Sequence, residues 1–86
     1  MTFEKMNQFN IWDNILEGLK ECLGATTVHT WFSNVKIKKA KYNSVVLSTS
    51  TAFKAAIIET RFLTILKTLF SKAMGFPVQV EIAIRD

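Results

Sequence analysis

Residue types that could support catalysis are few in this chain, and their spacing does not form a site. His29 is the single histidine, and no cysteine or second histidine stands at metal-ligand spacing from it. We expect His29 to be a solvated helix residue and Cys22, on an apolar helix face, to be buried. Glu17 and Glu21 share a helix face, but exposed acids at this spacing are usually only solvated. With no Gly-rich phosphate loop either, we expect no enzyme, no metal and no cofactor.

A basic run is the next candidate for function. Lys36, Lys38, Lys39 and Lys41 precede Tyr42 on a predicted β-hairpin. Such a hairpin could grip a phosphate backbone while the tyrosine stacks on a base. The favoured interpretation is that the lysines protect an edge strand from aggregation. Weak single-stranded nucleic-acid binding is therefore the alternative function.

A long helix predicted over residues 51–74 has an irregular polar face. At about 100° per residue, its apolar positions form one stripe for the core. Members of that stripe are Ala55, Ile58, Phe62, Ile65, Leu66, Leu69 and Ala73, whereas Thr60, Thr64, Lys67 and Ser71 form the solvent stripe. Phe53 and Ile57 also fall on the solvent stripe. Either the hairpin loop or a chain terminus covers them, or they are a docking patch for a partner.

The remaining elements follow from periodicity. Helical spacing predicts a helix over 10–23, with Asn10 as its N-cap and Gly24 as its stop. A short helix over about 26–34 follows, capped by Thr26 or Thr27. Strands are predicted around 35–38, over 44–49 after a turn that includes Asn43, and over 78–84, where apolar and polar residues alternate. The order helix, helix, strand, strand, helix, strand predicts an α+β fold with helices on one face of a three-stranded sheet.

Two tryptophans and one glycine within the helices need comment. Trp12 and Trp31 lie on apolar helix faces, and we expect both in the core. Gly18 interrupts the first helix at a cost of about 1 kcal/mol relative to Ala, which indicates that another element packs closely there.

Bulk composition limits the class of protein. Eighty-six residues predict a single domain over 1–86, and one cysteine allows no internal disulfide. No apolar run approaches the roughly 20 residues of a membrane span, so we expect a cytoplasmic protein without membrane contact. The net charge of +4 hints at an acidic partner.

Four stretches of this chain resemble the N-terminal domain of the bacterial replication initiator DnaA. They are Ile-Trp-Asp-Asn-Ile-Leu-Glu-Gly-Leu-Lys-Glu-Cys-Leu (11–23), Thr-Val-His-Thr-Trp-Phe (27–32), Val-Val-Leu-Ser-Thr-Ser-Thr-Ala-Phe (45–53) and Thr-Arg-Phe-Leu-Thr-Ile-Leu (60–66). The resemblance implies a K-homology-like fold and protein docking: self-association, recruitment of the replicative helicase and binding of regulatory proteins. It implies a self-association role for Trp12 and a helicase contact for Phe53.

This chain also departs from that family pattern. Ser50-Thr51-Ala52-Phe53 replaces a Pro-Asn-Arg/Lys-Phe sequence, and Thr27 replaces an acidic residue that the family uses for partner contact. The Gly-x-x-Gly loop with which K-homology domains clamp nucleic acid is missing. The ATPase and helix-turn-helix parts of the initiator are not among the 86 residues, so we expect an excised domain or a free-standing relative.

Overall fold

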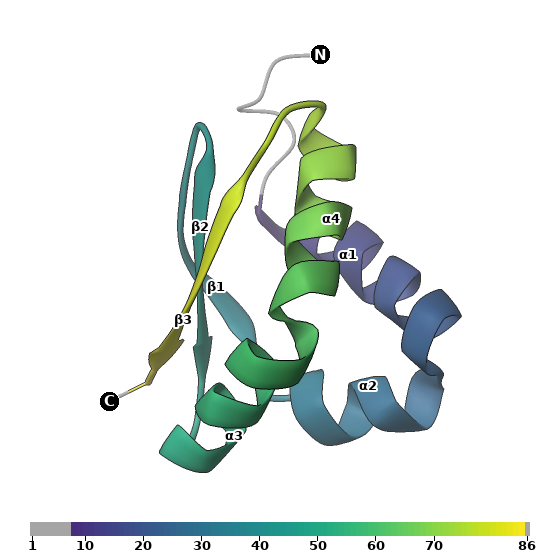
Figure 1. The fold of residues 1–86 in the computed structure, drawn as a ribbon, viewed down its shortest axis with the longest axis vertical. Helices are drawn as coiled ribbons and strands as arrows, with labels where there is room; N and C mark the ends of the chain where they lie inside the picture. Colours follow the sequence, from purple (N-terminus) through teal and green to yellow (C-terminus); the bar gives the residue numbers. More distant parts are fainter. Residues whose placement is uncertain (1–7, 86) are drawn as a thin grey trace.

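The computed structural model of the chain describes residues 8–85 (Figure 1). Its elements are α1 (Gln8–Leu23), α2 (Ala25–Phe32), β1 (Lys36–Lys41), β2 (Ser44–Thr49), α3 (Ala52–Ile57), the π-helical turn η2 (Ile58–Phe62), α4 (Leu63–Met74) and β3 (Gln79–Ile84). Segments α3, η2 and α4 follow one another without a break and form the long third helix. The element order confirms the predicted α+β fold. The likeness to K-homology domains stays a prediction.

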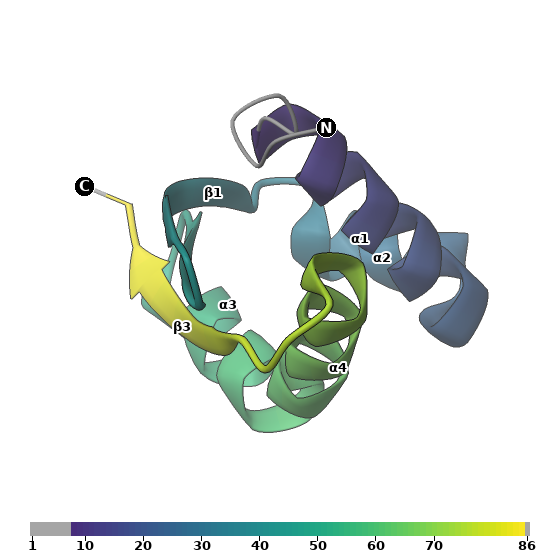
Figure 2. The same ribbon diagram turned by 90° about the horizontal axis from the view of Figure 1, so that it is seen from above.

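The three strands form one mixed sheet in the order β1-β2-β3. β1 pairs with β2 antiparallel, and β2 pairs with β3 in parallel. Within residues 8–85, all helices lie on one side of this sheet and no helix covers its other side (Figure 2). The inner face therefore carries Val45 and Leu47 of β2, which pair with Val80 and Ile82 of β3.

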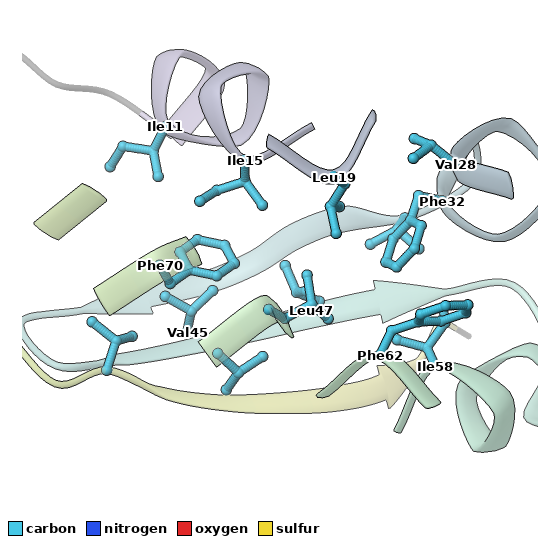
Figure 3. Close-up of a cluster of buried hydrophobic side chains, with 14 residues drawn as sticks. Ile11, Ile15, Leu19, Val28, Phe32, Val45, Leu47, Ile58, Phe62 and Phe70 are labelled. Atoms are coloured by element: carbon cyan, nitrogen blue, oxygen red, sulfur yellow. The ribbon is translucent and has the colours of Figure 1, made fainter. Parts of the chain in front are cut away.

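The core lies between the inner face of the sheet and the helices (Figure 3). The face of α1 toward the core carries Ile11, Ile15 and Leu19, at the helical spacing that the sequence predicts. These buried side chains point toward Phe70 of α4. At the other end of the core, the rings of Phe32 and Phe62 lie 5.5 Å apart between centroids. Burial of such apolar side chains is the main favourable term for a domain of this size.

The helix starts differ from the sequence predictions. α1 begins at Gln8, so Asn10 lies in its first turn and is not the N-cap. α2 begins at Ala25 and is preceded by Gly24, whose φ of 89° only glycine adopts easily, and no side chain caps it. The predicted caps Thr26 and Thr27 are thus wrong, because the positive φ of the glycine allows a tighter turn than expected.

The prediction that Cys22 is buried is also wrong, because its side chain is exposed. Cys22 has the right helical phase for the apolar face of α1. However, the last turn of α1 extends past α4 in both views (Figures 1 and 2), so this position has less of the molecule to pack against.

The π-helical turn η2 changes which residues of the long helix face the core. A π turn inserts one extra residue, which shifts all later positions by about 100° around the axis. Phe70 consequently lies in the core with no exposed surface, although a uniform α-helix leaves it out of the core stripe. Ala73, predicted in that stripe, is exposed for the same reason.

The same shift moves Ser71 away from the predicted solvent stripe. Ser71 is half-buried, and its Oγ accepts a hydrogen bond of 3.0 Å from the backbone N–H of Val78. Gly75 ends α4 in the left-handed conformation with φ 84°, directly after the last residue of the helix predicted over 51–74. Beyond it, the N–H of Gln79 donates to the carbonyl of Asn43 at 2.8 Å, which ties the start of β3 to the hairpin turn. Asn43 lies in the turn between β1 and β2, as predicted, and does not have a positive φ.

A β-bulge in β1 decides where its lysines point. Ile37 pairs with Leu47 and Lys39 pairs with Val46, so Lys38 is an extra residue without a partner on β2. Without the bulge, Lys39 would share the inner face with Ile37, because strand side chains alternate. With it, the cation is directed to the uncovered face of the sheet.

No helix within residues 8–85 is both long enough and apolar enough to cross a membrane.

Candidate interaction surface

Phe53 is held at the start of α3 with two thirds of its side chain exposed, at 67%. Thr51 caps this helix, because its hydroxyl accepts a hydrogen bond of 3.2 Å from the backbone N–H of Lys54. Such a cap contributes about 1 kcal/mol and orders the turn that presents Phe53. The predicted exposure of Phe53 is confirmed, and neither the hairpin nor any described segment covers it.

Trp31 of α2 contacts Phe53 and joins the two helices at the surface. The ring centroids lie 6.1 Å apart and the ring planes are tilted by 46°. Trp31 is half-buried and packs against the core, so it is not the fully buried tryptophan that we predicted. Because Trp31 is partly packed against the core, its ring is held in place where it contacts Phe53.

The other two predicted partner-binding residues continue this surface. Thr27 lies one helical turn before Trp31 on α2, and Ile57 lies one turn after Phe53 on α3, so each shares a helix face with one of the rings. Thr27 and Ile57 are both half-buried, and Ile57 packs against the core. The prediction that Ile57 faces solvent is therefore correct only in part. We name these four residues, Thr27, Trp31, Phe53 and Ile57, the aromatic patch.

Trp12, the predicted self-association residue, lies elsewhere, on α1. Its ring stacks on Phe70 with 6.3 Å between centroids and 17° between planes. Trp12 is half-buried and also lines a groove between α1 and α2 together with Leu16, Lys20 and His29. The predicted core position of Trp12 is thus correct for one part of its ring, and the other part is accessible to solvent. His29 is exposed, as expected.

The predicted nucleic-acid residues extend along β1 to the hairpin turn. Lys36 pairs with Ser48, close to the end of β2 from which α3 follows, whereas Lys41 and Tyr42 lie at the opposite end of the sheet. Lys36, Lys38, Lys39 and Lys41 are all exposed, and Tyr42 at the hairpin turn is 75% exposed. In Figure 1 the hairpin turn is at the top of the sheet, whereas α3 begins at the bottom. The sequence-predicted residues therefore form separate surfaces and do not combine into one site.

Sequence reasoning missed two surface residues. Trp31 was assigned to the core, and Phe76, whose ring stacks on Tyr42 with 4.6 Å between centroids, was not considered. Phe76 lies directly between Gly75 and Pro77. An apolar ring between two chain-turning residues is a signal that could have marked it as a loop aromatic close to the surface.

No group of three or more His, Cys, Asp or Glu side chains within the described residues is arranged to hold a metal ion. The fold and these surfaces define a small α+β domain with an exposed aromatic patch on its helical layer.

Comparisons with known proteins identify the family to which this α+β domain belongs. The family model of the DnaA N-terminal domain matches residues 10–72. The chain is 32% identical over 80 residues to the chromosomal replication initiator protein DnaA of Thermodesulfovibrio yellowstonii, covering 92% of this chain and 18% of that protein. It is 26% identical over 86 residues to the protein of the same name from Rickettsia bellii, covering 100% of this chain and 19% of the relative. The chain thus belongs to the DnaA N-terminal domain family, and it spans about a fifth of the length of these curated relatives.

Proposed function

We propose that this chain is a protein-docking module of a replication initiator, and that the aromatic patch is its surface for the replicative helicase or an initiation regulator. The contact between Trp31 and Phe53 carries the proposal. Exposed aromatic residues held on rigid helices are enriched among the anchors that dominate binding energy at protein interfaces. Because Trp31 is itself packed against the core, the patch loses little side-chain freedom when a partner covers it.

The charge around the patch favours an acidic partner surface. Between Glu21 and Glu59 the chain contains no acidic residue and five lysines, and the whole aromatic patch lies within this stretch. Lys54, next to Phe53, is half-buried. An apolar anchor with a lysine beside it is complementary to an apolar pocket with a carboxylate at its rim. Thr27, where the family carries an acid, removes a negative charge that would oppose such a rim.

The experiment is a calorimetric titration of the chain with the replicative helicase of the same organism, which measures the binding affinity. We expect Phe53→Ala to weaken binding by a factor of about 30 or more, as hot-spot truncations do. Tyr42→Ala is the matched control, because it removes an equally exposed aromatic ring from the opposite end of the sheet. Equal effects of the two variants, or no effect of either, would contradict the proposal for this partner and this patch.

For self-association we propose the groove beside Trp12. Its half-exposed ring is stacked on Phe70, so an aromatic surface is already ordered next to Leu16 and Lys20. Sedimentation of the chain over a range of concentrations tests this idea. Trp12→Ala is expected to abolish any dimer, whereas Leu69→Ala, which also removes packing between α1 and α4, is expected to leave it.

A further inference from the structure

The two edges of the sheet differ in how they are protected against the addition of another strand. β1 carries four lysines and the bulge at Lys38, and both features discourage such an addition. β3 pairs with β2 in regular register from Gln79 to Ile84, and Glu81 is its single charged residue. Within residues 8–85 no strand pairs with the outer edge of β3. The β3 edge therefore has neither a partner strand nor the protection that β1 shows.

The unpaired backbone groups of this edge belong to alternate residues of β3. The N–H groups of Gln79 and Arg85, at the two ends of the strand, donate to backbone carbonyls on the β2 side at 2.8 and 2.7 Å. Because these groups alternate in direction along a strand, Val80, Ile82 and Ile84 direct their N–H and C=O to the outer edge. Val80 is buried, but Ile82 is half-buried and Ile84 is exposed. The second half of β3 can thus pair with an incoming strand.

Apolar side chains flank this accessible half on the side of the helices. Ile84 is 48% exposed, although it follows Val80 and Ile82 on the inner face of the sheet. A hollow of about 340 Å³ lies beside β3, and Leu63 at the start of α4 lines it together with Ile82. An added strand would direct every second side chain toward Ile84 and Leu63, which favours apolar residues at those positions.

The charge at this edge is opposite to that of the whole chain. The net charge is +4, but the charged residues that line the hollow are Glu59 of η2 and Glu81 of β3, both exposed. Neither forms an ion pair within the part of the chain that the structure describes. The guanidinium of Arg85 does not neutralise them, because it donates to the carbonyl of Asn34, directly before β1. A cationic side chain on the incoming strand is therefore complementary to this edge.

We propose that the open edge of β3 binds an extended segment of a partner protein as an added strand, with apolar residues toward Ile84 and Leu63 and a lysine or arginine beside Glu81. Strand addition takes its affinity from main-chain hydrogen bonds and its specificity from pockets for alternate side chains. The β3 edge offers both kinds of contact. A second copy of this chain would have to present β1, whose bulge bends the strand.

This surface is separate from the aromatic patch. In Figure 1 the end of β3 and helix α2 lie on opposite sides of α3. Phe53 contacts Trp31 of α2 and so belongs to the other side. Phe53→Ala is therefore expected to leave binding at the β3 edge unchanged, and either proposal can fail without the other.

Amide hydrogen exchange of the full chain, measured by NMR with and without a short peptide of alternating valine and lysine, tests the proposal. In the free chain the N–H groups of Ile82 and Ile84 should exchange faster than those of Glu81 and Ala83, which face β2. With peptide at about ten times its dissociation constant, exchange at Ile82 and Ile84 should slow about tenfold. Slow exchange at both residues in the free chain, or no change on adding peptide, would overturn the proposal.

Fluorescence anisotropy of the labelled peptide measures the effect of single residues. Glu81→Gln is expected to weaken binding by about 2- to 5-fold, and Glu21→Gln, which removes an exposed acid from α1, should leave the affinity unchanged. Ile84→Pro removes an outward N–H without removing a hydrogen bond to β2, and should weaken binding about fivefold or more. Ile84→Val keeps this N–H and is the matched control. Equal affinities for each variant and its control would contradict the proposal.

Modified peptides test strand pairing without any change to the protein. N-methylation of the valines blocks the amides that face β3 in an antiparallel addition, and N-methylation of the lysines blocks those that face it in a parallel one. One methylated peptide should bind about tenfold more weakly or worse, and the other should bind like the parent peptide. Equal affinities of the two methylated peptides would refute strand addition.

Two further measurements test the chemistry of the occupant. A peptide of alternating valine and glutamate should bind more weakly than the lysine peptide, and equal binding would refute the role of Glu81. Sedimentation of the chain identifies the remaining alternative. A dimer that Trp12→Ala retains and the lysine peptide dissociates would show that a second copy occupies the β3 edge, which would overturn the assignment to a partner segment.

Discussion

The rings of Trp31 and Phe53 contact each other across two helices that the β-hairpin separates in the chain, with 6.1 Å between their centroids. Trp31 belongs to α2 and packs partly on the core, whereas Phe53 opens α3 and is largely in solvent. An aromatic ring exposed in this way adds little to the stability of the monomer but is already positioned for a partner. This separation of fold from function can be tested by stability measurements.

Phe53→Ala should lower the free energy of unfolding by less than about 1 kcal/mol, because little of this side chain is buried in the monomer. Phe62→Ala is the control: its ring is buried against Phe32, and the loss should be about 3–5 kcal/mol. Urea unfolding followed by far-ultraviolet circular dichroism measures both. A loss for Phe53→Ala close to that for Phe62→Ala would mean that Phe53 is part of the core.

Thr49→Val should stabilise the domain by about 1 kcal/mol. The side chain of Thr49 is fully buried, and no described group forms a hydrogen bond with its Oγ1. Replacing an unpaired buried hydroxyl by a methyl group of similar shape removes the cost of its desolvation. Thr64→Val, at an exposed helix position, should give no such gain. Thermal unfolding of both variants measures the difference, and a destabilised Thr49→Val variant would indicate that the hydroxyl is hydrogen-bonded.

Gly18 should tolerate alanine but not a larger residue. A Cβ atom at Gly18 would lie 2.9 Å from Cδ2 of Leu69, which is the flexible end of a half-buried side chain. Alanine gains about 1 kcal/mol of helix propensity, which offsets the movement of Leu69, so we expect a change within about 1 kcal/mol. Gly18→Leu should instead cost about 1–3 kcal/mol through overpacking between α1 and α4. Urea unfolding of the two variants decides, and equal losses would contradict this account.

Deletion of Lys38 should leave the fold intact. Lys38 is the extra residue of the bulge, so removing it keeps Ile37 opposite Leu47 and Lys39 opposite Val46. We expect a change in unfolding free energy below about 1 kcal/mol. Deletion of Ala40 is the control, because it would bring Lys41 to the inner face opposite Val45 and bury a charge. Circular dichroism and amide exchange should show a folded first variant and an unfolded second one.

Local patterns were sufficient for most of the fold. The last strand, whose alternation is the clearest in the chain, pairs with β2 through Val80 and Ile82, as its apolar positions suggest. Ile11, Ile15 and Leu19 on α1 are in the core for the same reason: three- and four-residue spacing places them on one helix face. Gly75 ends the long helix because its conformation depends only on its own backbone.

The sequence predictions of burial were wrong where contacts with a neighbouring element, or an insertion in a helix, decide which side chains face the core. Phe70 is buried and Ala73 is exposed, the reverse of the prediction, because η2 accommodates one extra residue. The helical periodicity of the sequence does not indicate that insertion. Lys39 reaches the outer face only because β1 bulges against β2. Cys22 is exposed in the last turn of α1, which extends past α4 (Figure 1).

Taken alone, the sequence determined the type and order of the elements, the position of Phe53 on the polar face of its helix and the basic character of the hairpin. These properties depend on residue type and on spacing within a single element. Only the tertiary structure brought Trp31 to Phe53 and Phe76 to Tyr42, because each pair joins segments that are distant in the chain. Such contacts are set by how helices and strands pack together, and no local period records that packing.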